Sequence, residues 1–104
     1  MSENPNFQIE LPEPWHWIET DFETELNREL PHGHILEGKT LKTVAKRQDM
    51  DDFLFAIDNW EFEYAIVHLT WVKETDKKWP ITKLYKNWKD VYEKRILPDS
   101  IDWD

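Results

Sequence analysis

The sequence predicts a two-layer α+β fold with an N-terminal helix, a three- to four-stranded antiparallel sheet and a C-terminal helix. Apolar residues recur at three- and four-residue spacing in the first third of the chain and again near its end. Between these stretches they alternate with period two, which is typical of strands. The length of 104 residues suits one domain. We assign residues 1–12 as an arm of this domain and residues 98–104 as a tail.

The first helix is expected to begin at Pro14, because proline is tolerated in the first helical turn. Pro31 and Gly33 are expected to end it. Its outer face is rich in glutamate. Its apolar stripe would consist of Trp15, Ile18, Phe22, Leu26 and Leu30.

Four later segments are predicted to form the sheet: 41–47, 53–57, 61–72 and a short edge strand over 81–85. Segment 61–72 is apolar on both faces, which favours a central position. A closing helix follows over residues 88–96.

Asn87 is expected to cap the start of this closing helix, and Pro98 is expected to end it.

The composition excludes several classes of protein. The 13 Lys and Arg residues against 22 Asp and Glu give a net charge of −9, which makes nucleic acid an unlikely direct partner. Seven tryptophans argue against disorder. The absence of cysteine excludes a disulfide framework and a Cys-based zinc site. No apolar run approaches the length of a membrane helix, and we expect no signal peptide. A cytoplasmic protein without a membrane contact is the expectation.

Two short motifs resemble a known group. An Asp-Asp-x-Leu-Phe sequence occurs at Asp51–Phe55, and a Val-His-Leu-Thr-Trp sequence occurs at Val67–Trp71. With Trp79-Pro80 they are similar to short uncharacterised bacterial proteins. The resemblance implies a bacterial cytoplasmic origin and one small domain, and it brings no catalytic residues.

His68 is the most prominent candidate for chemistry, because it lies within an otherwise apolar strand. It is either a general base or ligand, or an imidazole whose hydrogen bonds are satisfied in the core. Asp51 and Asp52 are either turn residues or carboxylates that accept a bond from Arg47 or His68. A bond from His68 to either aspartate would create a base with its orienting group and leave only a nucleophile missing.

His32 and His34 flank a glycine, but Pro31 and Gly33 explain this segment as a loop after the helix. No third ligand has diagnostic spacing, so we expect no metal and no cofactor.

Protein binding is the function that the composition favours. Residues 1–52 carry 5 basic and 12 acidic side chains, a balance of −7, whereas residues 53–104 carry 8 and 10, a balance of −2. An acidic surface attracts basic partners. Tryptophan is enriched at the energetic centres of interfaces. The candidate binding residues are Trp60, Trp79, Glu19 and Glu23.

We therefore expect a binding module for a basic protein, for example a module that inhibits or neutralises it. The alternative is a small enzyme or ligand-binding protein centred on His68 with Asp51, Asp52 and Arg47. A homodimer formed through Trp79 or the edge near residues 81–85 is a third interpretation. An enzyme is the less favoured class, because no complete catalytic constellation is evident.

Overall fold

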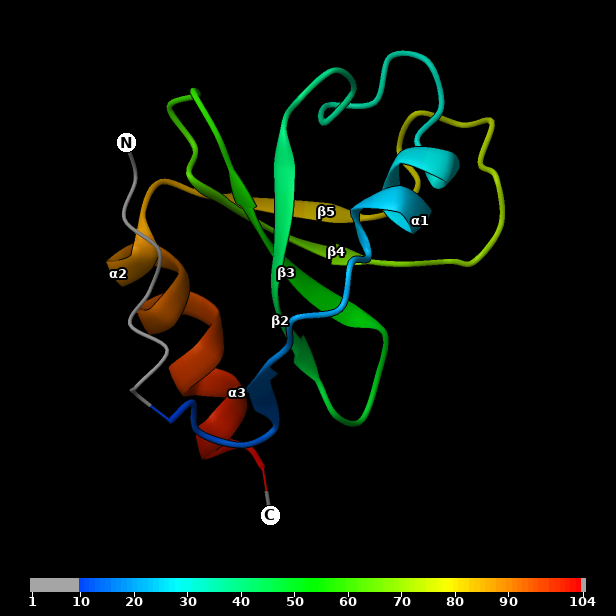
Figure 1. Ribbon diagram of the computed structural model, residues 1–104. Coiled ribbons are helices and arrows are strands. Elements are labelled where there is room, and N and C mark those ends of the chain that lie inside the picture. The colour runs from blue at the N-terminus through cyan, green and yellow to red at the C-terminus, as the bar shows by residue number, and fades with distance from the viewer. Residues whose placement is uncertain (1–9, 104) are drawn as a thin grey trace.

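The computed structural model describes residues 10–103 and shows a five-stranded antiparallel sheet with helices on both of its faces. The strands are joined in chain order, so that each pairs with the next (Figure 1). They are β1 (Trp15–Trp17), β2 (Leu41–Arg47), β3 (Asp52–Ile57), β4 (Tyr64–His68) and β5 (Thr82–Tyr85). The expected arm over residues 1–12 lies largely outside the described residues.

The additional strand is β1, which replaces the first half of the expected N-terminal helix. Trp15 is buried and His16 is exposed, which is the alternation of a strand, and β1 pairs with residues 45–47 of β2. The prediction of one helix over residues 14–30 was therefore wrong. The prediction of three to four strands was wrong for the same reason.

Helix α1 is short and spans Glu23–Glu29. Its start is fixed by Asp21, whose carboxylate accepts hydrogen bonds from the backbone and the hydroxyl of Thr24. An Asp side chain that satisfies the free N–H groups of a first turn is a recognised helix-start signal. Asp21 lies in the middle of the segment that the apolar spacing predicted to be one continuous helix.

The C-terminal helical segment runs further than predicted. It consists of α2 (Trp88–Val91), a π-helical turn (Tyr92–Ile96) and α3 (Leu97–Ile101). Asn87 accepts a hydrogen bond from the backbone of Asp90, so the predicted cap is confirmed. Pro98 does not end the helix, because it occupies the first turn of α3, where its missing N–H is tolerated. Residues 98–101 of the expected tail are thus helical.

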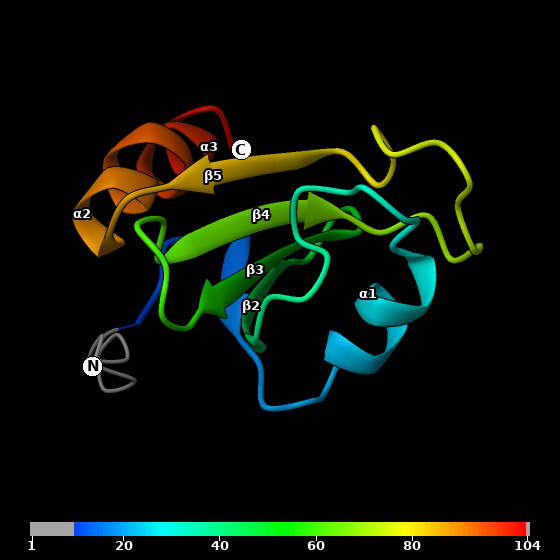
Figure 2. The same ribbon diagram turned by 90° about the horizontal axis from the view of Figure 1, so that it is seen from above.

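The C-terminal helical segment and α1 lie on opposite sides of the sheet (Figure 2). The sheet thereby separates two apolar cores, so the expected two layers account for only one of its faces. On one face, Leu54 and Ile66 pack against the C-terminal helical segment. On the other, Phe53 and Val67 pack with Leu26 of α1. This alternation along β3 and β4 confirms that the central strands are apolar on both sides.

The expected stripe of the first helix is divided between these cores. Trp15 belongs to the face covered by the C-terminal segment, whereas Phe22 and Leu26 belong to the opposite face. β2 contains an irregularity between Thr43 and Ala45, which is the signature of a β-bulge.

β4 ends at His68, several residues before the expected end of the strand at residue 72. Trp71 adopts a positive φ of 64°, and its backbone N–H points to Glu29 instead of a neighbouring strand.

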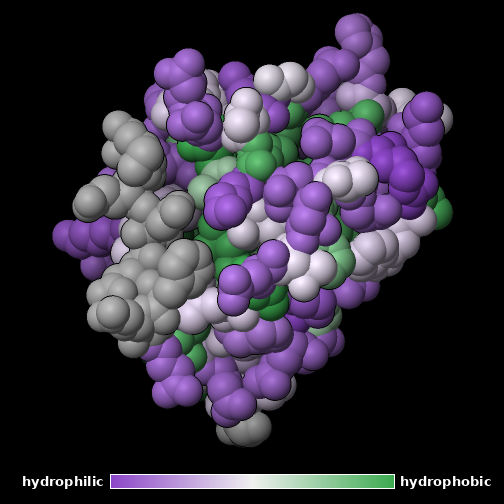
Figure 3. Space-filling model, viewed as in Figure 1, coloured by the Kyte–Doolittle hydropathy of each residue, from purple (hydrophilic) through white to green (hydrophobic). Residues whose placement is uncertain are grey.

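Hydrophilic side chains cover most of the face seen in Figure 3, with apolar patches in its recesses. Within residues 10–103, no helix is long and apolar enough to cross a membrane.

Candidate functional site

His68 and Asp52 form a hydrogen-bonded pair at one end of the sheet. The register of β3 and β4 places the two residues directly opposite each other. His68 Nδ1 lies 2.7 Å from Asp52 Oδ1. The His68 side chain is 52% exposed, whereas that of Asp52 is only 13% exposed. An accessible imidazole is therefore oriented by a carboxylate that is largely removed from solvent.

The second oxygen of Asp52 is held by the C-terminal helical segment. Arg95 Nη2 donates to Asp52 Oδ2 at 2.9 Å, and Arg95 Nε donates to Asp99 Oδ2 at 3.2 Å. Asp99 Oδ2 also accepts from Trp15 Nε1 at 2.9 Å and lies 3.2 Å from Arg47 Nη1. We call these six residues, including His68, the Asp52 cluster.

The opposite charges within the Asp52 cluster stabilise each other's ionised forms. Burial disfavours the charged form of Arg95, but the nearby Asp99 and the hydrogen bond to Asp52 outweigh it and raise the pKa of Arg95. Burial raises the pKa of Tyr85, and the influence of Arg95 opposes that shift. Arg95 therefore remains a cation, and Asp52 accepts charge-assisted hydrogen bonds.

These contacts determine which nitrogen of His68 carries a proton. The Asp52 carboxylate has no proton to donate while Arg95 binds it, so Nδ1 of His68 must be the donor. In the neutral imidazole, Nε2 then holds a lone pair. Nε2 makes no hydrogen bond to any residue in the described part of the chain. The pair is a base with its orienting group, and no hydroxyl of residues 10–103 is hydrogen-bonded to it as a nucleophile would be.

The other sequence candidates take different positions. Arg47 joins the Asp52 cluster through Asp99 and also holds Asp49 with two hydrogen bonds of 2.9 Å. Asp51 does not join it. Its carboxylate accepts from Trp71 Nε1 at 2.9 Å, because Asp51 and Asp52 point in different directions. The structure thus brings Asp52 and His68 together and places Asp51 elsewhere.

Two members of the Asp52 cluster were not singled out from sequence. Arg95 and Asp99 have the four-residue spacing of an ion pair on one helix face, which was the available signal. The expected stop at Pro98 separated Asp99 from that helix and hid the pattern.

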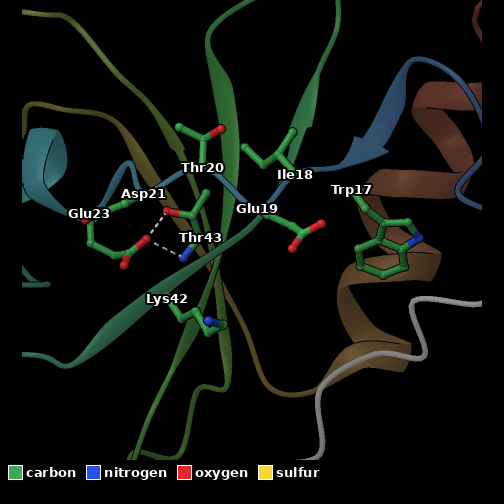
Figure 4. Close-up of a pocket in the computed structure, with 8 residues that line it drawn as sticks. All are labelled: Trp17, Ile18, Glu19, Thr20, Asp21, Glu23, Lys42 and Thr43. Carbon is green, nitrogen blue, oxygen red and sulfur yellow. Dashed lines mark hydrogen bonds between the residues drawn. The ribbon is translucent and has the colours of Figure 1, made fainter.

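A second candidate site is an open groove of about 680 Å³ between β1, α1 and β2, which we call the acidic groove (Figure 4). It is lined by Trp17, Ile18, Glu19, Thr20, Asp21, Glu23, Lys42 and Thr43. Three of these residues are acidic and one is basic. The Glu19 carboxylate points toward the Trp17 side of the groove.

The three carboxylates of the acidic groove differ in the hydrogen bonds that they accept. Glu23 accepts from the backbone N–H of Thr43 at 2.8 Å and from the Thr43 hydroxyl. The hydrogen bonds from Thr24 hold the pKa of Asp21 below its usual value. Glu19 is exposed and has no hydrogen bond or ion pair with the residues described here. Glu19 is therefore the most available negative charge in the groove.

The tryptophans proposed for binding lie away from this groove. Trp60 packs against the core on the α1 side, and Lys39 Nζ lies 4.1 Å from the centre of its ring. Trp79 is 39% exposed. Neither residue lines the acidic groove, whereas the candidates Glu19 and Glu23 both do.

The histidines of the loop after α1 have different surroundings. His34 is buried, and its two ring nitrogens are used by the carbonyl of Pro80 and the backbone N–H of Leu36. His32 is almost fully exposed and lies 3.3 Å from Glu37. Among residues 10–103, no three His, Asp or Glu side chains are grouped so that they could hold a metal ion.

No protein-family model, curated protein or solved structure matches this chain. The Asp52 cluster and the acidic groove are therefore interpreted from their own residues.

Proposed function

We propose that this protein is a binding module that receives a basic segment of a partner protein in the acidic groove. The observation that carries the proposal is Glu19, an exposed carboxylate inside a groove with no cation bound to it among residues 10–103. A lysine or arginine side chain would supply the missing counter-charge.

The aromatic wall of the groove suits the same partner. Trp17 is stacked on Trp88 of α2, with ring centroids 5.7 Å apart and an interplanar angle of 23°. Trp88 in turn contacts Tyr64 and Tyr92. A tryptophan fixed in this way offers a rigid surface to the apolar stem and the charged head of a basic side chain.

The size and the surrounding charge agree with this binding mode. A groove of about 680 Å³ can take a few side chains but not a folded domain. The N-terminal half of the chain, which supplies every lining residue, carries the balance of −7. This field would accelerate the approach of a basic partner at low ionic strength. Inhibition of the partner would follow where the bound segment is needed for its activity, and the proposed setting is the cytoplasm.

The test compares two variants with the same change in charge. Glu19→Lys alters the groove, whereas Glu93→Lys alters an exposed glutamate on the C-terminal helical segment. The probe is a fluorescent oligo-arginine peptide, and its binding is measured by anisotropy at low and high salt. We expect binding at low salt that Glu19→Lys abolishes and Glu93→Lys largely preserves. An equal loss in both variants would show that only the net charge matters and would reject the groove.

The same pair of variants also identifies the natural partner. Capture from a bacterial lysate at low salt should retain a basic protein on the wild-type chain and on Glu93→Lys. Glu19→Lys should not retain it.

A further inference from the structure

His68 differs from the other histidines because Asp52 orients its ring through Nδ1 while Nε2 makes no hydrogen bond to the described residues. His34 uses both nitrogens within the protein. His32 is 98% exposed and meets a half-exposed Glu37 at 3.3 Å. His16 is exposed on β1 and has no hydrogen bond to the described residues. Among the contacts of residues 10–103, only that of His68 has Nδ1 fixed at 2.7 Å from a largely buried carboxylate.

We infer that His68 is a phosphoryl-acceptor site, at which Nε2 takes a phosphoryl group from a phosphorylated side chain of another protein that approaches from solvent. The Asp52 carboxylate places the proton on Nδ1, so the lone pair is on Nε2. Arg95 prevents Asp52 from turning away, because it holds the second carboxylate oxygen at 2.9 Å. A histidine paired with aspartate in this way is a stronger nucleophile than a free one.

The surroundings of His68 suit a group that carries negative charge. Lys83 on β5 lies opposite Ile66, and Ile66 shares a face of β4 with His68. Lys83 is thus a diagonal neighbour of His68, a separation of about 7–8 Å that a long side chain can bridge. Lys83 is exposed and forms no ion pair with the described residues. Lys83 can therefore bring a cationic side chain toward a phosphoryl group on Nε2, whereas Arg95 acts through Asp52 on the Nδ1 side of the ring.

The position of His68 on the surface suits transfer from another molecule. His68 lines neither the acidic groove nor the neighbouring groove that contains Glu13 and His16 of the β1 region. The imidazole instead stands at the end of β4 with half of its side chain in solvent. A donor that brings its own phosphate-binding residues can reach it, which is the arrangement that protein-to-protein phosphoryl transfer requires. This inference does not depend on the acidic groove.

The transfer is a single displacement at phosphorus. The Nε2 lone pair forms the N–P bond while the bond between phosphorus and the leaving group breaks. The leaving group departs with that electron pair and takes a proton from solvent where it needs one. The proton on Nδ1 remains there. Asp52 balances the positive charge that develops on the ring, as a carboxylate does for a catalytic imidazolium.

Phosphoramidate is the probe, because it phosphorylates accessible histidines without an enzyme and releases ammonia. The full chain is incubated with it near neutral pH, and mass spectrometry locates the added group. We expect His68 to react roughly tenfold faster than His16 and His32 in the same molecule, which is the effect of about 1.4 kcal/mol from a charge-assisted hydrogen bond. Equal rates at the three histidines would overturn the inference.

Two variants separate this chemistry from simple exposure. Asp52→Asn should bring the rate at His68 down to that of His16, with the fold checked by circular dichroism. Lys83→Gln removes an exposed charge and should slow His68 several-fold, whereas Lys86→Gln, a matched exposed lysine beyond the end of β5, should not. An unchanged rate in Lys83→Gln, or equal slowing by the two lysine variants, would contradict the assigned surroundings even if Asp52→Asn failed to fold.

Discussion

Glu29 is the residue on which the loop after β4 depends. It is fully buried at the end of α1. Its oxygens accept hydrogen bonds from the backbone N–H and hydroxyl of Thr70 at 2.9 and 3.0 Å, and from the backbone N–H of Trp71 at 2.8 Å. These bonds hold Trp71 in its left-handed backbone conformation. One acidic side chain that was predicted to lie on an outer helix face thus sets the end of β4.

Replacing Glu29 with glutamine is expected to lower the free energy of unfolding by about 2 kcal/mol. Glutamine has only one acceptor oxygen, so its NH₂ group would face a donor in the buried site. Urea denaturation measures the change. Glu61→Gln, at an exposed position, serves as the control and should stay within about 0.5 kcal/mol. An equally mild effect of Glu29→Gln would show that water replaces these bonds without cost.

The effect of Glu29→Gln should also depend on pH. Burial raises the pKa of Glu29 above its usual 4.5, and so does the hydrogen bond that its protonated form donates to the Glu25 carboxylate. The folded chain therefore holds this proton more tightly than the unfolded chain, so the associated stability is complete below pH 4.5 and is lost as the pH rises through the raised pKa. The stability difference between wild type and Glu29→Gln should shrink over that range. A difference that widens with pH would contradict the direction of the shift.

At the scale of the elements, the Asp52 cluster joins the C-terminal helical segment to four strands. Trp15 lies in β1, Arg47 in β2, Asp52 in β3 and His68 in β4, while Arg95 reaches them from the π-helical turn. A π-helical turn widens the helix locally and often marks a functional position. The turn places Arg95 and Asp99 together on the side of the helix that faces the sheet.

Arg95→Ala is expected to destabilise the fold by about 3 kcal/mol, because it leaves the largely buried Asp52 without its cation. Lys94→Ala is the matched control. Lys94 is the neighbouring residue and forms an exposed ion pair with Asp90, so its loss should leave the unfolding midpoint nearly unchanged. The double variant Asp52→Asn with Arg95→Ala should recover part of the loss. No recovery would mean that Arg95 acts through packing alone.

The start of the C-terminal helical segment provides a second test at this scale. Asn87 accepts from the backbone of Asp90 at 2.9 Å, and Asp90 accepts from the backbone of Lys86 at 2.8 Å. Asn87→Ala should lower the free energy of unfolding by about 1 kcal/mol. Asn87→Ser should retain most of the stabilisation by the cap, because serine also caps helices. Thermal and urea unfolding would measure both. Equal losses in the two variants would show that the side-chain cap is not what stabilises this end.

Local patterns predicted the elements whose boundaries depend on nearby residues. β2, β5 and the Asn87 cap follow from alternation, edge composition and cap chemistry. The failures came from long-range contacts. Trp15 has the spacing of the helix stripe but pairs with β2, and Glu29 ends β4 from across the molecule. The pairing of Asp52 with His68 required the strand register, which periodicity alone does not determine.

At the scale of the whole molecule, the charge of −9 acts on folding and on binding in opposite ways. Within the folded chain the excess carboxylates repel one another, which disfavours the compact state. Toward a basic partner the same carboxylates attract. Salt screens both interactions, with a Debye length that falls from about 10 Å at 0.1 M to about 3 Å at 1 M.

Raising sodium chloride from about 0.1 to about 1 M is therefore expected to increase the midpoint of thermal unfolding while it releases the oligo-arginine peptide. If the unfolding midpoint rises with salt while binding falls, the loss of binding at high salt cannot be attributed to unfolding of the chain. Differential scanning fluorimetry and the peptide anisotropy assay would be run in the same buffers. A midpoint that falls with salt would show that attraction within ion pairs such as Arg95 with Asp52 outweighs the repulsion among the excess carboxylates. Glu19→Lys, which lowers the net negative charge by two, should raise the midpoint at low salt more than at high salt, and it should do so while abolishing peptide binding.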